Sequence, residues 1–168
     1  MQAENAMAGS YDTAQICLNG HVINAISKLH SEANQNYCSE CGERTITECP
    51  NCGIEIRGQF VPDYTFQRAP SYDAPGYCRQ CGVRLPWTQR RLDVARMLVE
   101  EFEQLTDAER KQLVGTFPDL FVETPRTAAA ELTFKRLILK AGKEAADAMR
   151  RILLDILSEA VRKSLFGP

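Results

Sequence analysis

The sequence predicts an α+β protein, in which a small cysteine-rich β module is followed by an all-α helical region that ends in a long amphipathic helix. All seven cysteines of the 168 residues lie between Cys17 and Cys81, among short segments whose apolar residues alternate as in β-strands. The chain beyond the cysteines is rich in Leu, Ala, Arg, Lys and Glu, with apolar residues at helical spacing. We therefore predict a flexible N-terminal tail over residues 1–10, the β module over 11–88 and the helical region over 89–168.

Composition and charge narrow the class of protein. No stretch approaches the roughly 20 apolar residues that a membrane span needs, and the N-terminus lacks the basic region and apolar core of a secretion signal. We therefore expect a cytoplasmic protein. With 20 basic and 22 acidic residues, nothing in the whole-chain charge demands a polyanionic partner. The first ten residues show no apolar periodicity, which is why we expect a tail there.

Four pairs of metal-ligand residues divide the β module. The cysteine count is odd and no secretion signal is present, so metal binding explains the pattern better than a disulfide framework. A Cys-x-x-Cys turn lets two thiolates reach one ion, and a second pair closes the tetrahedron. Eight ligands therefore supply two closed sites, and we predict two Zn²⁺ per chain. The predicted ligands are Cys17, His21, Cys38, Cys41, Cys49, Cys52, Cys78 and Cys81.

The segments around these pairs predict the remaining elements of a double zinc-ribbon module. Residues 21–27, 44–48 and 54–60 alternate as strands do, so we expect two β-hairpin zinc knuckle modules. Glycine follows the second ligand in three pairs, where it tolerates the positive φ of a tight turn. Residues 61–77 cluster Pro, Gly, Asp and Ser and predict a surface loop.

Two groupings of the pairs are compatible with this spacing. Sequential pairing joins the first pair to the second and the third to the fourth, across gaps of 16 and 25 residues that can each hold a hairpin. The nested alternative joins the second pair to the third across a gap of seven residues, which leaves the first and last pairs to meet. We favour the sequential arrangement.

The cysteine module offers no visible catalytic machinery. A catalytic zinc keeps one position open, whereas the eight ligands fill two sites completely. The run from Cys49 to Cys52 resembles a redox-active dithiol, but it is one of four pairs between strands. The nucleobase-deaminase signature is absent, because His21 is followed by Val-Ile and Glu48 precedes the third pair. We therefore predict that the protein is not an enzyme and that His30 is an ordinary loop histidine.

The helical region opens with an amphipathic segment. Thr88 can cap a helix over residues 89–105. Its apolar residues share one face, as expected of a helix that packs on a core. They are Leu92, Ala95, Leu98, Val99 and Phe102.

A second helix is indicated by a capping box that Thr106 forms with Glu109. We expect this helix to end near Val114, because Gly115 follows. Residues 117–121 then predict an apolar connection that packs on the helices.

The final segment opens with Pro125 at the first helical position after Thr124 and meets no strong stop before Gly167. A continuous helix here would measure about 60 Å, so it either packs outside its own domain or breaks near Gly142 and folds back. Its apolar stripe comprises Phe134, Ile138, Ala141, Ala145, Met149, Ile152, Ile156, Ala160 and Val161.

Three interpretations of this stripe compete. In the first interpretation, the stripe forms part of the core of the monomer and the charged face of the helix lies in solvent. Alternatively it drives self-association as a helical bundle or coiled coil, because it is longer than the two preceding helices can cover. The third interpretation is an amphipathic helix on a membrane surface, which the nine basic and five acidic residues from Thr124 onward favour.

Several runs of residues together resemble a bacterial family known only as domain of unknown function 2321. The most specific feature is the first knuckle, where Cys-Leu-Asn-Gly-His replaces a cysteine pair. The resemblance implies a bacterial or phage cytoplasmic source and zinc at the eight ligands, and it implies no reaction or partner. The runs are residues 12–24, 38–42, 45–46, 49–52, 70–71, 78–82, 86–88, 124–127 and 140–143.

We therefore predict a non-catalytic, zinc-binding interaction or assembly protein. The zinc ribbons would present a surface to another protein, and the C-terminal helix would build a homo-oligomer. The alternatives are a nucleic-acid-binding zinc-ribbon regulator and a protein that associates with a membrane surface through its last helix.

Overall fold

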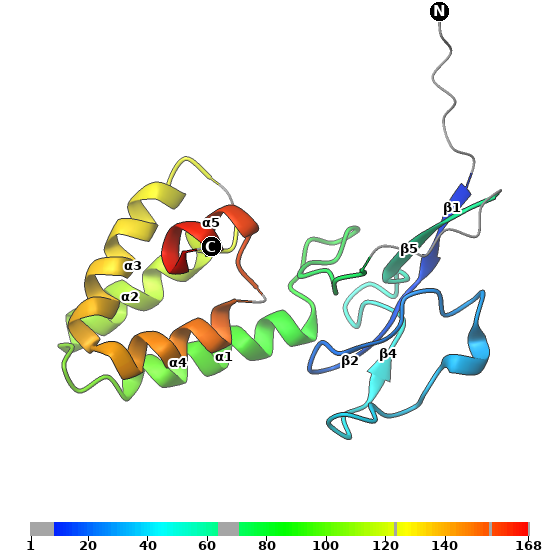
Figure 1. Ribbon diagram of the computed structural model, residues 1–168, viewed down its shortest axis with the longest axis horizontal. Coiled ribbons are helices and arrows are strands. Elements are labelled where there is room, and N and C mark those ends of the chain that lie inside the picture. The colour runs from blue at the N-terminus through cyan, green and yellow to red at the C-terminus, as the bar shows by residue number, and fades with distance from the viewer. Residues whose placement is uncertain (1–8, 64–70, 123, 155, 168) are drawn as a thin grey trace, which may run out of the picture. The chain divides into compact units, whose positions relative to one another are not determined.

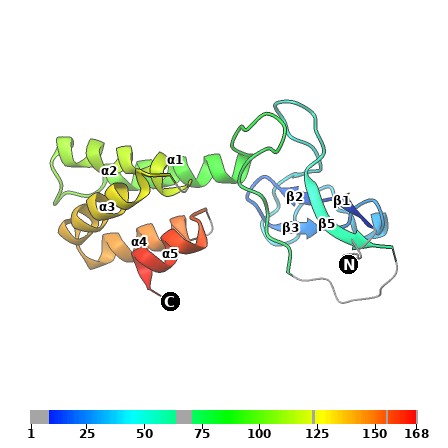
Figure 2. The same cartoon turned by 90° about the horizontal axis from the view of Figure 1, so that it is seen from above.

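The structure is a computed structural model that describes residues 9–63, 71–122, 124–154 and 156–167. It divides into two compact units, unit 1 before and unit 2 after a boundary between Thr88 and Gln89. All the described strands belong to unit 1, whereas the four helices from Asp107 onward belong to unit 2 (Figure 1, Figure 2). The predicted α+β class is confirmed.

Unit 1 contains two small antiparallel sheets. β1 (Gly9–Thr13) pairs with β5 (Arg57–Pro62), with Tyr11 opposite Phe60. In the second sheet, β2 (Gln15–Cys17) lies between β3 (Val22–Asn24) and β4 (Thr45–Ile46). Each of the three predicted strand segments contains a strand over part of its length, with β5 shifted toward the C-terminus, and β1 and β2 are additional strands.

The N-terminal boundary of the module differs from the prediction. Gly9 and Ser10 belong to β1 rather than to a tail, while residues 1–8 of the predicted tail lie outside the described residues. A side chain at Gly9 would come within 2.5 Å of the Val61 carbonyl oxygen, so this glycine allows the strand to extend. In the predicted loop, residues 64–70 lie outside the described residues, whereas Val61 and Pro62 belong to β5.

The core of unit 1 is small. Trp87 is buried in it, and its indole N–H donates a 2.9 Å hydrogen bond to the carbonyl of Pro75. Two of the buried core residues, Cys49 and Cys78, are predicted metal ligands, so the core adjoins the predicted metal site. The described core residues are Ala14, Ile16, Cys49, Ile56, Cys78, Leu85 and Trp87.

Helix α1 (Pro86–Glu100) begins and ends earlier than predicted. Pro86 takes the first helical position, where the missing N–H loses no intrahelical bond, and Thr88 therefore lies inside the helix. The chain turns after the helix, and the guanidinium of Arg110 donates to the Phe102 carbonyl at 3.1 and 3.2 Å. The predicted apolar face is buried at Leu92, Ala95, Val99 and Phe102, with Leu98 half-buried.

Helix α2 (Asp107–Leu120) has the predicted start and a different end. The capping box is present, since the Glu109 N–H donates to the Thr106 hydroxyl at 3.3 Å and the Thr106 N–H donates to the Glu109 carboxylate at 3.0 Å. The helix then continues through Gly115 and Pro118, so the predicted end near Val114 and the predicted connection over residues 117–121 were wrong. Packing overrides local propensity here, because Phe117 and Leu120 are fully buried.

The final segment forms three helices rather than one long amphipathic helix. α3 (Thr127–Ala141) ends at Gly142, whose φ of 101° interrupts the helix, and α4 (Lys143–Leu153) follows. A second break, which we did not predict, precedes α5 (Glu159–Phe166). The break near Gly142 is the alternative in which the segment folds back, and α3 packs on α2, α4 and α5.

Most of the predicted stripe lies inside unit 2. Six of its nine residues are buried, two are half-buried and Ala160 is exposed. The stripe thus has a partner within the chain, as the core interpretation requires.

In the part of the chain that the structure describes, no helix combines the length and the apolar character that a membrane crossing needs. The described core residues of unit 2 are Leu92, Ala95, Val99, Phe102, Leu105, Leu113, Phe117, Leu120, Phe121, Ala130, Phe134, Leu137, Ile138, Ala141, Ala145, Met149, Leu153, Leu157 and Val161.

Candidate metal centres

Three of the four ligand pairs form the same tight turn. At Cys38 the backbone N–H donates to the Glu43 carbonyl at 2.8 Å, and the Cys38 carbonyl accepts from the N–H of Gly42 at 2.8 Å. The turns that begin at Cys49 and Cys78 repeat both bonds at 2.8–2.9 Å. Each turn is closed by an isolated antiparallel bridge between flanking residues. These bridges join Tyr37 to Arg44, Glu48 to Glu55 and Tyr77 to Arg84.

The glycine after each of these pairs has the predicted left-handed conformation. Gly42, Gly53 and Gly82 have φ values of 70°, 70° and 69°. A Cβ added at any of the three glycines would meet no atom within 4 Å. Glycine is therefore required because a residue with a Cβ is strained at these φ angles, not because neighbouring atoms exclude a side chain. The sequence pattern therefore identified the turn type correctly.

The first knuckle is the turn of the hairpin between β2 and β3. Its backbone is closed by a 3.0 Å bond from the Cys17 N–H to the His21 carbonyl and a 2.8 Å bond from the Gly20 N–H to the Cys17 carbonyl. A side chain at Gly20 would lie 3.0 Å from Cβ of Trp87, which is in the core of unit 1. The hairpin thus fixes both ligands against the core.

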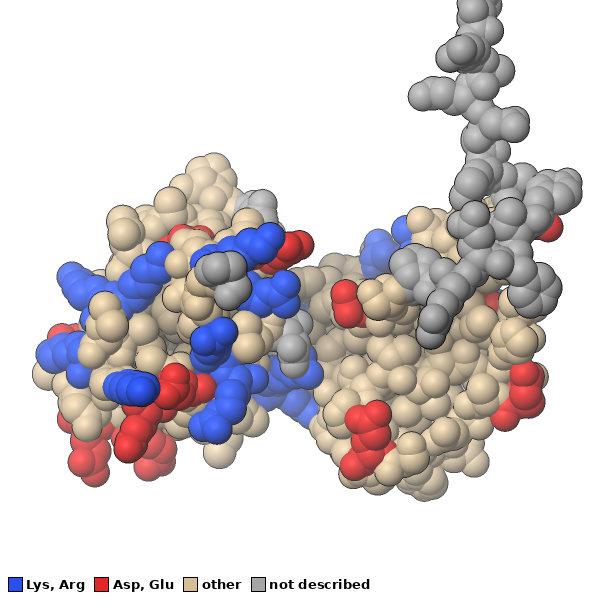
Figure 3. All heavy atoms as spheres, viewed as in Figure 1, with Lys and Arg blue, Asp and Glu red and all other residues tan. Residues whose placement is uncertain are grey.

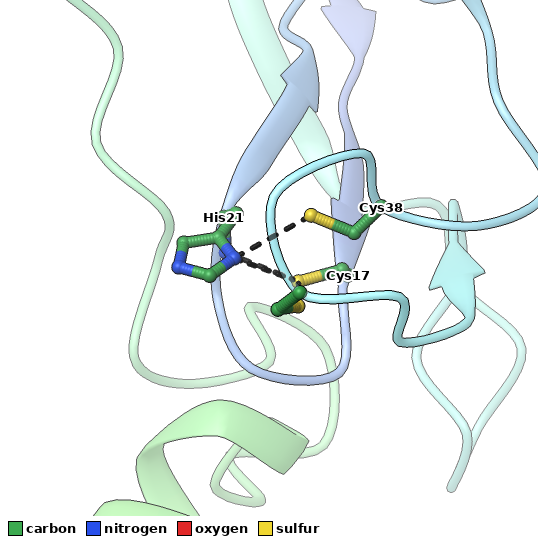
Figure 4. Close-up of side chains that lie close together, drawn as sticks. Cys17, His21 and Cys38 are labelled. Carbon is green, nitrogen blue, oxygen red and sulfur yellow. Dashed lines mark hydrogen bonds between the residues drawn. The ribbon is translucent and has the colours of Figure 1, made fainter.

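Centre 1 consists of Cys17, His21, Cys38 and Cys41, whose ligand atoms all lie within 4.8 Å of one another. Nδ1 of His21 points at two thiols, 3.6 Å from Sγ of Cys17 and 3.5 Å from Sγ of Cys38 (Figure 4). Sγ of Cys17 lies 3.8 Å from Sγ of Cys41. The four donors therefore surround one point.

Centre 2 consists of Cys49, Cys52, Cys78 and Cys81, again within 4.8 Å of one another. Sγ of Cys49 lies 3.9 Å from Sγ of Cys81, and Sγ of Cys52 lies 3.6 Å from Sγ of Cys78. The structure thus brings all eight predicted ligands together in the sequential grouping, not in the nested one.

These separations fit a four-coordinate ion. A tetrahedron with metal–sulfur distances of about 2.3 Å has sulfur–sulfur edges of about 3.8 Å, close to the separations in both centres. A disulfide requires about 2.05 Å between sulfurs. Both groups can therefore each hold one metal ion.

Burial follows the same rule in both centres. The first cysteine of each knuckle is buried, namely Cys17, Cys38, Cys49 and Cys78. The second cysteine of each Cys-x-x-Cys pair is exposed, namely Cys41, Cys52 and Cys81. One side of each centre therefore belongs to the core and the other faces solvent.

The surroundings shift the thiol pKa values in opposite directions. The backbone N–H of Glu43 and the Asn19 amide lower the pKa of Cys41 to about 6, and the N–H of Val83 and the Asn51 amide lower that of Cys81 to about 6. At Cys52 the N–H of Ile54 lowers the pKa, but desolvation and the neighbouring thiols outweigh it and raise the value to about 12. Burial raises the pKa of Cys17. A bound cation would remove this conflict, because it favours thiolate at every ligand.

Sequence reasoning missed three side chains around the ligands. Nδ2 of Asn19 donates to Sγ of Cys41 at 3.5 Å, and Oε2 of Glu40 lies 3.7 Å from Nε2 of His21. A carboxylate at that nitrogen favours the tautomer in which Nδ1 is free to bind a metal. The Asn51 amide lowers the pKa of Cys81. All three stand two residues after the first ligand of a knuckle, a regularity that the sequence already contains.

Sequence reasoning also missed a cleft beside centre 2. It has a volume of about 510 Å³, and Cys49 and Cys78 lie among its lining residues. Its aromatic lining comprises Tyr11, Phe60, Tyr72 and Tyr77. The guanidinium of Arg57, another lining residue, sits 4.3 Å from the centre of the Tyr11 ring.

Comparison with known proteins gives one match. A family described as "Uncharacterized protein conserved in bacteria (DUF2321)" matches residues 10–165. No curated protein and no solved structure matches the chain.

Proposed function

The chain belongs to this bacterial family, domain of unknown function 2321, and from that premise we propose that it is a non-catalytic zinc-binding protein whose zinc module presents a surface to another protein. The observation that carries the proposal is the pair of closed four-donor centres. The family itself brings no reaction.

The donor chemistry favours zinc. Thiolates and imidazole are the ligands that structural zinc sites use, in the Cys₃His and Cys₄ combinations of centres 1 and 2. The hard cations Mg²⁺ and Ca²⁺ require oxygen ligands, which neither group supplies. The separations of the donor atoms fit tetrahedral geometry, which zinc prefers.

Zinc would serve folding in this protein. The core of unit 1 is small and includes two of the ligand cysteines. Structural zinc contributes roughly 10–16 kcal/mol in zinc-finger peptides, more than a β-core of this size supplies. The β module therefore depends on both ions.

A non-catalytic role follows because every candidate ligand residue belongs to one of the two four-donor centres. All seven cysteines and His21 belong to the two centres, which leave no open metal position and no spare thiol. The other histidine, His30, is exposed and faces Glu32 at 2.8 Å. Neither centre offers a nucleophile or a site for a metal-bound water.

A protein partner fits the surface of the module better than nucleic acid does. Up to Thr88 the chain has six basic and nine acidic residues, and zinc leaves both centres negative because each carries at least three thiolates. In Figure 3 few Lys and Arg side chains are visible on unit 1, whereas many gather over unit 2. Tyr11 and Tyr37 are 56% and 65% exposed, and tyrosine is enriched in protein interfaces. Nucleic-acid binding stays the alternative prediction. If the chain does not bind oligonucleotide probes at ~50 mM salt, where phosphate contacts are strongest, this alternative is excluded.

Assembly through the last segment has less support than we expected. The stripe packs inside unit 2, and the two most exposed large apolar side chains of the described helices, Leu132 and Leu139, lie outside it. Self-association and contact with a membrane surface therefore stay predictions. Light scattering on the zinc-loaded chain tests the first: if the stripe assembles the protein, Ile152→Glu reduces an oligomeric mass to that of a monomer.

Metal analysis of the purified chain tests the zinc proposal directly. We expect two zinc ions per chain and no thiol that reacts with a disulfide reagent before denaturation. Cys41→Ser should reduce the content below two zinc ions and unfold the β module, whereas Ser39→Ala, in the same knuckle but not a ligand, should leave two zinc ions and a folded module. Fewer than two zinc ions in the parent chain, together with titratable thiols, would contradict the proposal.

A further inference from the structure

Two apolar ridges lie on the surface of unit 2. The α1 ridge consists of Val94 and Met97, and the α3 ridge consists of Leu132 and Leu139. All four side chains are between 49% and 76% exposed, on the side of their helix away from its buried residues. Within the described part of unit 2, no other large apolar side chain on a helix is exposed. Neither ridge is therefore covered by its own chain.

An acidic group extends the α1 ridge by one turn. Glu101 follows Met97 by four residues, and its N–H donates to the Leu98 carbonyl at 3.1 Å, so the chain is still turning there. Arg90, one turn before Val94, already has an interaction partner. The Glu101 carboxylate is exposed and forms no ion pair with any described residue. The α1 ridge thus ends in an uncompensated negative charge.

A basic group lies inside the α3 ridge. Arg136 stands four residues after Leu132 and three before Leu139, which places it on the same side of α3 as both leucines. Its guanidinium donates to the neutral side-chain oxygen of Gln112 at 3.3 Å, so its positive charge is not neutralised by that contact. The neighbouring Lys140, by contrast, is held in an ion pair at 2.6 Å.

The spacing within the two ridges lets them fit each other. Met97 is one turn from Glu101, as each leucine of the α3 ridge is from Arg136. When Met97 packs on either leucine, Glu101 therefore lies opposite Arg136. Packing of the α3 ridge on a second α3 ridge would instead place two arginines together, which is unfavourable. Because both ridges are exposed within one chain, the matched contact requires a second copy.

We propose that the α1 ridge of one copy docks on the α3 ridge of a second copy, so that unit 2 carries the surface through which this protein associates with itself. The inference goes beyond the proposed function, because neither ridge contains a zinc ligand. It also differs from assembly through the apolar stripe, most of which is buried inside unit 2.

The form of the contact sets its strength and its symmetry. Two single helices bury less surface than the roughly 1,600 Å² of a standard interface, so association should be weak and depend on protein concentration. The contact joins different surfaces of the two copies. It therefore repeats into a ring or a chain of copies unless the same two copies also make the reciprocal contact.

Sedimentation equilibrium of the zinc-loaded full chain, over a range of protein concentrations, tests the proposal. We expect a mass that rises above that of a monomer with concentration. Glu101→Arg and Arg136→Glu should each raise the dissociation constant about tenfold, because each brings like charges together. The double variant Glu101→Arg/Arg136→Glu should recover the parent value, since it restores the pair with the signs exchanged. A double variant that associates no better than the single ones would overturn the assigned contact.

Matched controls separate the ridges from the rest of the surface. Lys111→Glu reverses an exposed charge on α2, outside both ridges, and should leave association unchanged. Leu132→Gln should weaken association, whereas Val122→Gln, at an exposed valine outside the helices, should not. A variant is compared only when its zinc content and helical circular dichroism match those of the parent, so that misfolding is not mistaken for a lost contact.

Two results would overturn the proposal outright. The first is a parent chain that stays monomeric at its highest soluble concentration. The second concerns a membrane, because a ridge of leucines with an arginine also has the character of a membrane-surface helix. If a monomeric parent sediments with vesicles of phosphatidylserine and phosphatidylcholine, and Arg136→Glu abolishes this binding while Glu101→Arg does not, the α3 ridge contacts a membrane rather than a second copy.

Discussion

Unit 1 and unit 2 contribute similar lengths of chain but hold themselves together differently. In the described part of the chain, seven buried residues form the core of unit 1 and nineteen form the core of unit 2. Two of the seven are candidate metal ligands, whereas the nineteen are apolar side chains from five helices and their connections. The comparison teaches that the short strands of unit 1 bury few apolar residues, while the helices of unit 2, over a similar length of chain, supply a larger apolar core. Ions at the two centres would compensate for this difference in unit 1.

Metal removal should produce the largest difference between the units. A chelator strong enough to strip both centres should unfold unit 1 and leave the helices of unit 2 formed, because only unit 1 depends on the ligands. Trp87, the single tryptophan, lies in the core of unit 1, so its fluorescence should move to that of an exposed indole while the helical circular dichroism persists. Zinc should restore the emission. An unchanged Trp87 spectrum after complete metal removal would break the comparison.

A core truncation in unit 2 should have the next largest effect. Leu137→Ala empties a site on α3 that is 2% exposed and should lower the free energy of unfolding of unit 2 by about 2–5 kcal/mol. Leu139→Ala is the matched control two residues away, where the side chain is 76% exposed, and it should change stability by less than about 0.5 kcal/mol. Urea unfolding followed by circular dichroism measures both. Loss of zinc from the Leu137→Ala chain would mean that the units are not independent.

Two glycine substitutions should act in opposite directions. Gly115→Ala lies in the middle of α2, where an added Cβ meets nothing within 4 Å, and it should stabilise unit 2 by about 1 kcal/mol. Gly42→Ala, at a φ of 70°, should destabilise the zinc-loaded unit 1 by about 1–2 kcal/mol, although its Cβ also has open space. Thermal unfolding with Trp87 and helical readouts separates the two. If both substitutions changed stability by the same amount and in the same direction, the space around the added Cβ, and not the backbone φ angle, would determine the effect.

The smallest expected effect is the pH dependence of one ion pair in unit 2. The ammonium of Lys140, 2.6 Å away, and the N–H of Thr106 lower the pKa of Glu109 to about 2. Because the folded value is depressed, the stabilisation is present above the unfolded value of about 4.3 and is lost as the pH falls toward 2. Glu109→Gln should therefore be less stable than the parent at pH 7 and equal to it near pH 2. The exposed Glu103→Gln serves as control, and a stability gap that persists at pH 2 would exclude this ion pair as its origin.

Sequence and structure agree most closely where covalent geometry or ligand chemistry dictates the backbone. The three Cys-x-x-Cys-Gly turns and the capping box at Thr106 each depend on neighbouring residues, and a local pattern is sufficient to identify them. The break near Gly142 was only one of two alternatives that the sequence allowed. The end of α2 could not be read in this way. Gly115 and Pro118 favour termination locally, whereas the burial of Phe117 depends on α3, which lies later in the chain.

For this protein the sequence by itself determined the α+β class, the eight candidate metal-ligand residues and the type of turn at the three Cys-x-x-Cys pairs, because residue type and spacing at short range are enough for each. Only the tertiary structure decided that these residues group sequentially, that most of the apolar stripe lies inside unit 2, and that the Asn19 amide reaches Cys41 across centre 1. These contacts join residues far apart in the chain. Their geometry follows from how strands and helices pack rather than from any local pattern of residues.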